Sequence, residues 1–94
     1  MLKISQVETP GRQLTFKLEG RLVGPWIKEL TGICEPRLAD GSTLALDLGE
    51  VAYAAEDGIA LLIELQDRGV TFENMTPFLT EQVRLARLRV PESD

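Results

Sequence analysis

Residues 44–69 read LALDLGEVAYAAEDGIALLIELQDRG, and the rest of the chain is organised around this segment. Leucines alternate with small or polar residues at its start, which is typical of a strand with one buried face. Apolar residues then recur at the three- and four-residue spacing of an amphipathic helix, and Gly69 is placed to end that helix. Because two carboxylates, Glu56 and Asp57, stand where the helix begins, we expect any functional site of the chain to lie there.

A hairpin is predicted at the start of the chain. Residues 2–5 alternate between apolar and polar side chains, and residues 14–19 repeat the alternation more clearly. The segment between them contains Pro10 and Gly11, which suit the two central positions of a type II turn. We therefore expect two antiparallel strands ahead of the first helix.

A helix should follow this hairpin. Pro25 suits its first turn, and its apolar stripe would include Ile27, Leu30 and Cys34. Pro36 has no N–H and its ring crowds the preceding turn, so the helix is expected to end or kink near Cys34.

The last quarter of the chain reads as a short strand followed by a helix. Residues 70–73 alternate between apolar and polar side chains. Thr76 and Pro77 have the order of a capping residue followed by a proline at the first helical position. We expect six apolar side chains of this helix to pack inward: Phe78, Leu79, Val83, Leu85, Ala86 and Leu88.

This order of elements predicts an α/β fold with a mixed four-stranded sheet. The first hairpin is antiparallel, and the remaining strands are parallel because each is reached through a right-handed helical crossover. Three helices should lie mainly on one face of the sheet. The other face would be partly open and carry polar side chains, namely Thr15, Lys17, Asp47, Thr71 and Glu73. Residues 1–90 are expected to form one domain, with 91–94 as a disordered tail.

Composition excludes several classes of function. A net charge of −5 opposes binding to the phosphate backbone of a nucleic acid. The chain has no histidine and a single cysteine, so it lacks the commonest general base and any multi-cysteine metal site. No segment resembles a secretory signal or a membrane span, and we expect a cytoplasmic protein without direct membrane insertion and without a bound cofactor.

Three loops should meet at the carboxyl edge of the parallel strands, where open α/β sheets tend to bind their partners. They are residues 20–24, 49–57 and 74–76. The candidate partner-binding residues at this edge are Glu56, Asp57, Gly58, Tyr53, Arg21, Gly24, Asn74 and Thr76.

The chain resembles the STAS domain, which occurs in bacterial anti-sigma factor antagonists and in sulphate transporters. The resemblance rests on Leu18-x-Gly20-Arg21-Leu22, on a helix, and on the apolar and glycine spacing from Leu44 through Tyr53 into Gly58-Ile59-Ala60-Leu61-Leu62. It implies the same mixed sheet and no catalytic activity. It also implies a protein partner, often an anti-sigma kinase.

The resemblance further implies a switch that this chain lacks. Members of the family are phosphorylated on a serine at the start of a helix, within Asp-Ser-Ser-Gly or Asp-x-Ser-Gly. Residues 55–58 occupy this motif here, with Asp57 at the serine position and Ala55 at that of the preceding aspartate. The resemblance therefore implies regulation of transcription by docking, without the phosphoserine cycle.

Simpler interpretations of the same residues compete with docking. Asp57 could be a helix N-cap that accepts a backbone hydrogen bond. Adjacent carboxylates cannot flank a scissile bond from opposite sides, so glycoside hydrolysis is disfavoured for Glu56 and Asp57. Cys34 is read as a small buried hydrophobe, and Trp26 as a core residue with an exposed anchor as the minor alternative.

Three classes of function follow. The first is a protein-interaction module of the anti-sigma factor antagonist type. The second is a cytoplasmic STAS subunit of a lipid or anion transporter that docks onto the transporter's ATPase. The third is a small-molecule-binding domain. An edge strand or the open face of the sheet could also support a homodimer.

Overall fold

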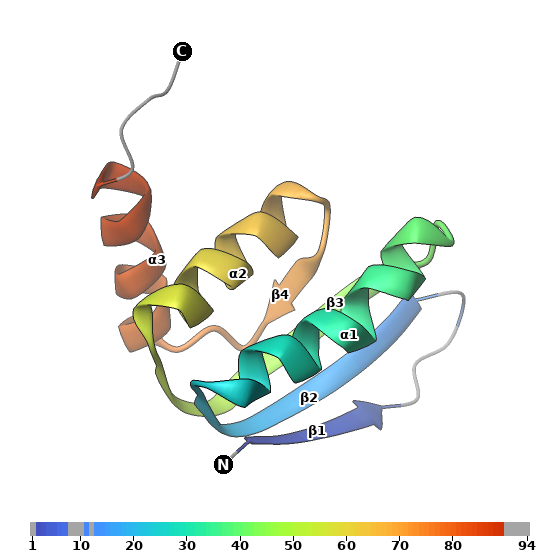
Figure 1. The fold of residues 1–94 in the computed structure, drawn as a ribbon, viewed down its shortest axis with the longest axis horizontal. Helices are drawn as coiled ribbons and strands as arrows, with labels where there is room; N and C mark the ends of the chain where they lie inside the picture. Colours follow the sequence, from blue (N-terminus) through green and yellow to red (C-terminus); the bar gives the residue numbers. More distant parts are fainter. Residues whose placement is uncertain (1, 8–10, 12, 90–94) are drawn as a thin grey trace.

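The computed structural model describes residues 2–7, 11 and 13–89. Its elements follow the predicted order, with β1 antiparallel to β2 and the pairs β2–β3 and β3–β4 parallel (Figure 1). They are β1 (Leu2–Val7), β2 (Gln13–Leu22), α1 (Pro25–Ala39), β3 (Thr43–Ala54), α2 (Glu56–Asp67), β4 (Thr71–Glu73) and α3 (Pro77–Arg89). The predicted mixed four-stranded sheet is confirmed.

The core lies between the sheet and the helices. Figure 1 shows α1 and α2 side by side over one face of the sheet, with α3 beside α2. The alternating leucines of β2 and β3 point at these helices and, apart from the half-buried Leu14, are almost fully buried, because every second side chain of a strand faces the same way. The central core side chains are Leu18, Leu44, Leu46, Leu48, Leu30, Leu62 and Leu65.

The opposite face of the sheet is partly open, but its centre is less exposed to solvent than expected. Lys17, Asp47 and Glu73 share one cross-strand row and keep contact with solvent. Thr15 was expected among these polar residues, yet it is only 3% exposed. The Gln13 amide donates hydrogen bonds to the hydroxyl of Thr15 at 3.4 Å and to the carboxylate of Glu73 at 3.5 Å, so long polar side chains cover the centre of this face.

Both central strands are longer than the alternation indicated. β2 continues to Leu22 and β3 to Ala54, so most of the two segments predicted as loops is strand. The two strands pair along this whole length, with register shifts on both sides of Gly20, whose φ is +115°. Glycines read as loop signals in the sequence instead mark these irregularities, since a bulge uses conformations that glycine adopts readily.

The prediction that the first helix ends near Cys34 is wrong. α1 continues through Pro36 to Ala39, because a proline in the last turn removes only one hydrogen bond while the packing of the helix persists. The guanidinium of Arg37 supports this turn. It donates to the carbonyl of Ile33 at 2.7 Å and lies 5.2 Å from the ring centroid of Phe16.

The final helix packs on only one side. Leu79 and Val83 are buried and Ala86 is half-buried, as expected. The other three predicted core residues are exposed, because a step of 100° per residue turns them away from the side that contacts α2. Phe78 is 48% exposed, Leu85 39% and Leu88 70%.

Two of the predicted helix boundaries are confirmed. The hydroxyl of Thr76 accepts a hydrogen bond from the Leu79 N–H at 3.1 Å and caps α3, and Gly69 follows α2 with a φ of +96°. Gly11 has the positive φ that a type II turn requires, while the remainder of that turn lies outside the described residues. The predicted tail at 91–94 also lies outside them.

Gly58 sets how closely α2 approaches the sheet. A Cβ at this position would lie 2.7 Å from the carbonyl oxygen of Leu22 and 3.1 Å from its side chain. That carbonyl also accepts a hydrogen bond from the Ala55 N–H at 3.1 Å. The first turn of α2 is therefore held directly against the end of β2.

Cys34 is the one cysteine of the sequence, and it is buried on the inner side of α1, as expected of a small hydrophobe. Burial raises the pKa of its thiol from 9.0 to about 11, because the charged thiolate would lose its hydration. The thiol is therefore neutral and shielded near neutral pH.

Replacing Gly58 by alanine should destabilise the fold. The new methyl group overlaps the Leu22 carbonyl, and we expect the free energy of unfolding in urea to fall by about 1–3 kcal/mol. Gly32→Ala is the matched control, since a Cβ at Gly32 meets nothing within 4 Å and alanine favours helix by about 0.5–1 kcal/mol. Equal gains in stability for both variants would contradict the proposed contact.

Stability should also depend on the Cys34 thiol at alkaline pH. The raised pKa means that the unfolded thiol ionises from about pH 9 while the folded one keeps its proton until about pH 11. The contribution is complete below pH 9 and is lost as the pH rises to 11. In urea unfolding, the stability difference between wild type and Cys34→Ala should shrink between pH 8 and about pH 10.5. A constant difference would show that the thiol does not titrate as described.

Candidate functional site

α2 begins at the end of β3 without an intervening loop. Ala55 is the only residue between the two elements, and its carbonyl accepts a hydrogen bond from the Ile59 N–H at 2.8 Å. With the bond from the Ala55 N–H to Leu22, this fixes the direction of the first helical turn. The side chains of Glu56 and Asp57 are therefore presented from a rigid part of the fold.

Asp57 does not cap the helix. The N-cap position belongs to Ala55, whose backbone is extended, and Glu56 and Asp57 are the first two helical residues. Both side chains are exposed, and within the described part of the chain neither carboxylate has a hydrogen-bond or ion-pair partner. The helix starts two residues earlier than the capping hypothesis requires, so both charges remain available while the helix dipole still favours them.

Three other candidate residues lie at the ends of β2 and β3. Arg21 and Tyr53 are paired across the two strands, and both are exposed, Tyr53 by 47%. Gly24 is exposed and precedes α1 with a φ of +56°, a conformation that suits glycine at this turn. The structure thus brings Tyr53, Arg21 and the first turn of α2 to one edge.

The remaining candidates have structural roles. Gly58 is buried against Leu22, and Thr76 caps α3. Asn74 has a φ of +56° and lies against Gly49, where a Cβ on that glycine would be 3.1 Å from the Asn74 Cβ. These residues shape the edge of the sheet through their own packing and turns.

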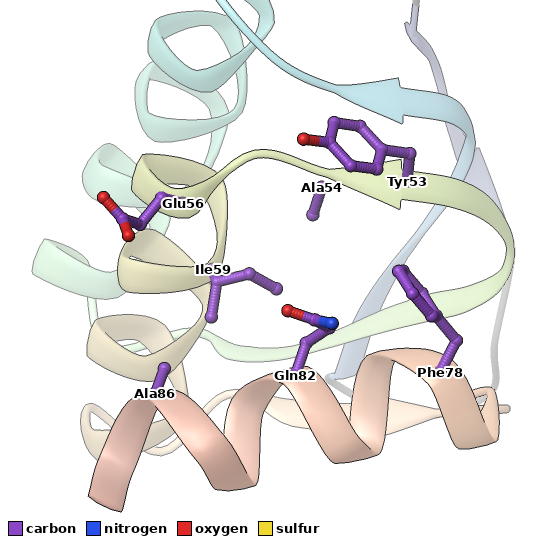
Figure 2. Close-up of a pocket in the computed structure, with 7 residues that line it drawn as sticks. All are labelled: Tyr53, Ala54, Glu56, Ile59, Phe78, Gln82 and Ala86. Atoms are coloured by element: carbon purple, nitrogen blue, oxygen red, sulfur yellow. The ribbon is translucent and has the colours of Figure 1, made fainter. Parts of the chain in front are cut away.

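A cavity of about 210 Å³ lies beside the first turn of α2, and the sequence did not reveal it. Figure 2 shows that its walls come from β3, α2 and α3, with the amide of Gln82 pointing into the space between Ile59 and Phe78. The lining residues are Tyr53, Ala54, Glu56, Ile59, Phe78, Gln82 and Ala86. Phe78 and Gln82 were missed because α3 was expected to bury Phe78, although their four-residue spacing separates them from the Leu79–Val83 stripe.

Some charged side chains elsewhere form ion pairs, whereas others, such as Glu29, Asp40 and Glu50, form none within the described residues. Arg68 binds Glu35 at 2.5 Å and approaches Glu64 at 3.9 Å. On α3, Arg84 pairs with Glu81, which lowers the pKa of that carboxyl group. Arg87 pairs with Asp67 at 3.0 Å. None of these ion pairs of the described residues includes Glu56 or Asp57. Arg84 and Arg87 are thus engaged with neighbouring acids.

Trp26 is half-buried and packs against the core, which agrees with the core assignment. Among the described residues there is no group of three histidine, cysteine or acidic side chains able to hold a metal ion. In the same part of the chain, the helices are too short or too polar to span a bilayer.

Comparison with solved structures shows the same fold. The structure is similar to the anti-sigma factor antagonist SpoIIAA in its unphosphorylated form, with a TM-score of 0.73 at 11% identity over 88% of this chain and 83% of that one. It is also similar to the Bacillus cell fate determinant SpoIIAA in its phosphorylated form, with a TM-score of 0.72 at 13% identity over 92% and 85% of the two chains.

A more distant match is an uncharacterised DUF3478-family protein from Shewanella loihica that has a SpoIIAA-like fold. Its TM-score is 0.57 at 18% identity, over 96% of this chain and 80% of that one. Comparison with curated protein sequences gave no match. The sequence profile of the family described as "Mlab, STAS domain" matches residues 5–90, nearly the whole chain, and the chain therefore belongs to the STAS-domain family.

Proposed function

We propose that this STAS domain is a non-catalytic docking module that binds a protein partner through the first turn of α2. The observation that carries the proposal is the pair of exposed, unpaired carboxylates of Glu56 and Asp57 on a backbone fixed by Leu22 and Ala55. A backbone that is already fixed loses little conformational freedom on binding, which favours recognition at such a site.

The docking turn would carry a permanent charge. A phosphoserine brings about −1.5 to −2 charges, whereas an aspartate brings a single charge that no kinase or phosphatase can alter. SpoIIAA has been solved both unphosphorylated and phosphorylated, so that relative exists in two charge states. With Asp57 at the serine position of the family motif, this chain would have only one state at this position.

Two partner classes are compatible with this surface. A partner of the anti-sigma factor type is supported by the similarity to SpoIIAA. A transporter ATPase is the second candidate, and the fixed charge of Asp57 favours it, because a permanent subunit has no need of a reversible release signal. A small-molecule site beside this turn is less well supported, since the cavity there, at about 210 Å³, is below the roughly 300–1,000 Å³ of typical ligand pockets.

The partner should depend on the charge of the first turn of α2. Cross-linking in the native cell, followed by affinity purification and mass spectrometry, identifies a candidate protein, and its affinity is then measured by calorimetry. The double variant Glu56→Gln/Asp57→Asn should bind about 2- to 30-fold more weakly, because two exposed charge pairs are lost with little change in shape. The Asp57→Ser variant should differ from wild type, and phosphorylation of that serine should change the affinity again.

The matched control is Asp40→Asn. Asp40 is exposed at the other end of the chain's first helix, so this variant removes one charge far along α1 from the docking turn. It should leave the affinity within about twofold. Equal affinities for wild type, Asp57→Ser and the double variant would refute docking through this turn.

A further inference from the structure

We propose that the cavity between β3, α2 and α3 receives one apolar side chain of the partner, carried next to a lysine or arginine. This inference deepens the proposed function and rests on it, because it names the chemistry of the partner segment. The cavity opens beside the first turn of α2, and Glu56 is one of its lining residues, with its carboxylate pointing away from the amide of Gln82 (Figure 2). One bound segment could therefore occupy the cavity and face the acidic turn together.

The size of the cavity favours a single side chain. At about 210 Å³ it is too small for a nucleotide or other cofactor, which need the larger pockets typical of such ligands. It is ample for one aliphatic or aromatic side chain. Anchors of this kind, inserted into a pocket at the centre of an interface, supply much of the binding energy of protein complexes.

The walls of the cavity are suited to an apolar anchor. Ile59 and Ala54 form its inner surface and are 4% and 6% exposed, so they are already part of the core. Tyr53 and Phe78 stand at its open side with about half of each side chain in water. Exposed aromatic side chains are enriched at protein interfaces, and covering these two would remove a substantial apolar area from solvent.

Gln82 adds a polar contact to this apolar surface. Its amide points into the cavity and makes no hydrogen bond within the described part of the chain (Figure 2). A primary amide both donates and accepts, which matches the N–H and C=O of a peptide backbone. Gln82 is therefore placed to bind the main chain of the residue whose side chain fills the cavity.

The charge beside the cavity selects a basic neighbour for the anchor. Four ion pairs engage the acids Glu35, Glu64, Asp67 and Glu81. Glu56 and Asp57 are two of the acids that have no cationic partner in the described residues, and they are the two beside the cavity. The whole chain also carries a net charge of −5, which attracts a cationic segment. An anionic segment would be repelled by the same field.

Capped dipeptides test this inference without a known partner. The probes are acetyl-leucyl-arginine amide, its citrulline analogue, which is neutral and nearly the same shape, and acetyl-leucyl-glutamate amide. We expect saturable NMR shifts at the amides of Ala54, Ile59 and Gln82 at millimolar concentrations. The arginine probe should bind about 2- to 10-fold more tightly than the citrulline probe, and the glutamate probe most weakly.

Variants then separate the cavity from the charge. Ala86→Leu fills the cavity from α3, and Phe78→Ala removes an exposed wall, so each should weaken binding of all three probes. Leu88→Ala is the matched control, because Leu88 is an exposed apolar residue of the same helix outside the cavity. The Glu56→Gln/Asp57→Asn variant should abolish the preference for arginine over citrulline while the leucyl side chain still binds.

Absence of saturable shifts at the cavity, or equal binding of the three probes to wild type, would overturn the inference. If the native partner nevertheless loses affinity with the Glu56 and Asp57 variants, the docking function stands and only the assignment of the cavity fails. If the probes bind as expected while the native partner binds those variants as tightly as wild type, the proposal of docking through this turn fails instead. Loss of probe binding in Leu88→Ala equal to that in Phe78→Ala would also count against the cavity.

Discussion

The carbonyl oxygen of Leu22 is the point on which the arrangement of this domain depends. It accepts the hydrogen bond that ends the strand pairing at Ala55, and it lies where any side chain on Gly58 would have to go. A helix can follow β3 immediately only because residue 58 has no Cβ and lets the two backbones touch. The position of the acidic turn against the end of β2 follows from this contact.

Sequence reasoning recovered the architecture because the dominant signals are local. The leucine alternation of β3, the helical spacing after Asp57 and the Thr76-Pro77 pair each report on their own backbone, and their order is sufficient to predict a mixed sheet. The long extents of β2 and β3 were not predictable in this way. They depend on pairing between the strands, which outweighs the turn tendency of Gly20.

Side-chain exposure on α3 was the least predictable feature, and it matters most for the site. Phe78, Leu85 and Leu88 read as core because they are apolar, whereas their exposure is decided by which side of the helix meets α2. Asp57 shows the same limit at a smaller scale. Aspartate is a residue type that suits an N-cap. The extended backbone of Ala55 nevertheless places Asp57 inside the first turn, with its carboxylate in solvent. In both cases a tertiary contact decided the role of the residue.

The aspartate at position 57 has a consequence for control in the cell. Where a phosphorylatable serine stands, an enzyme can change the affinity of a complex within seconds and without any protein being made or destroyed. If the domain docks through this turn, as proposed above, a carboxylate that is part of the chain cannot be switched in this way, and the occupancy of the complex follows mass action as far as position 57 is concerned. The cell could then adjust such an interaction only through the amounts of the two proteins, by their synthesis, degradation or confinement to one place.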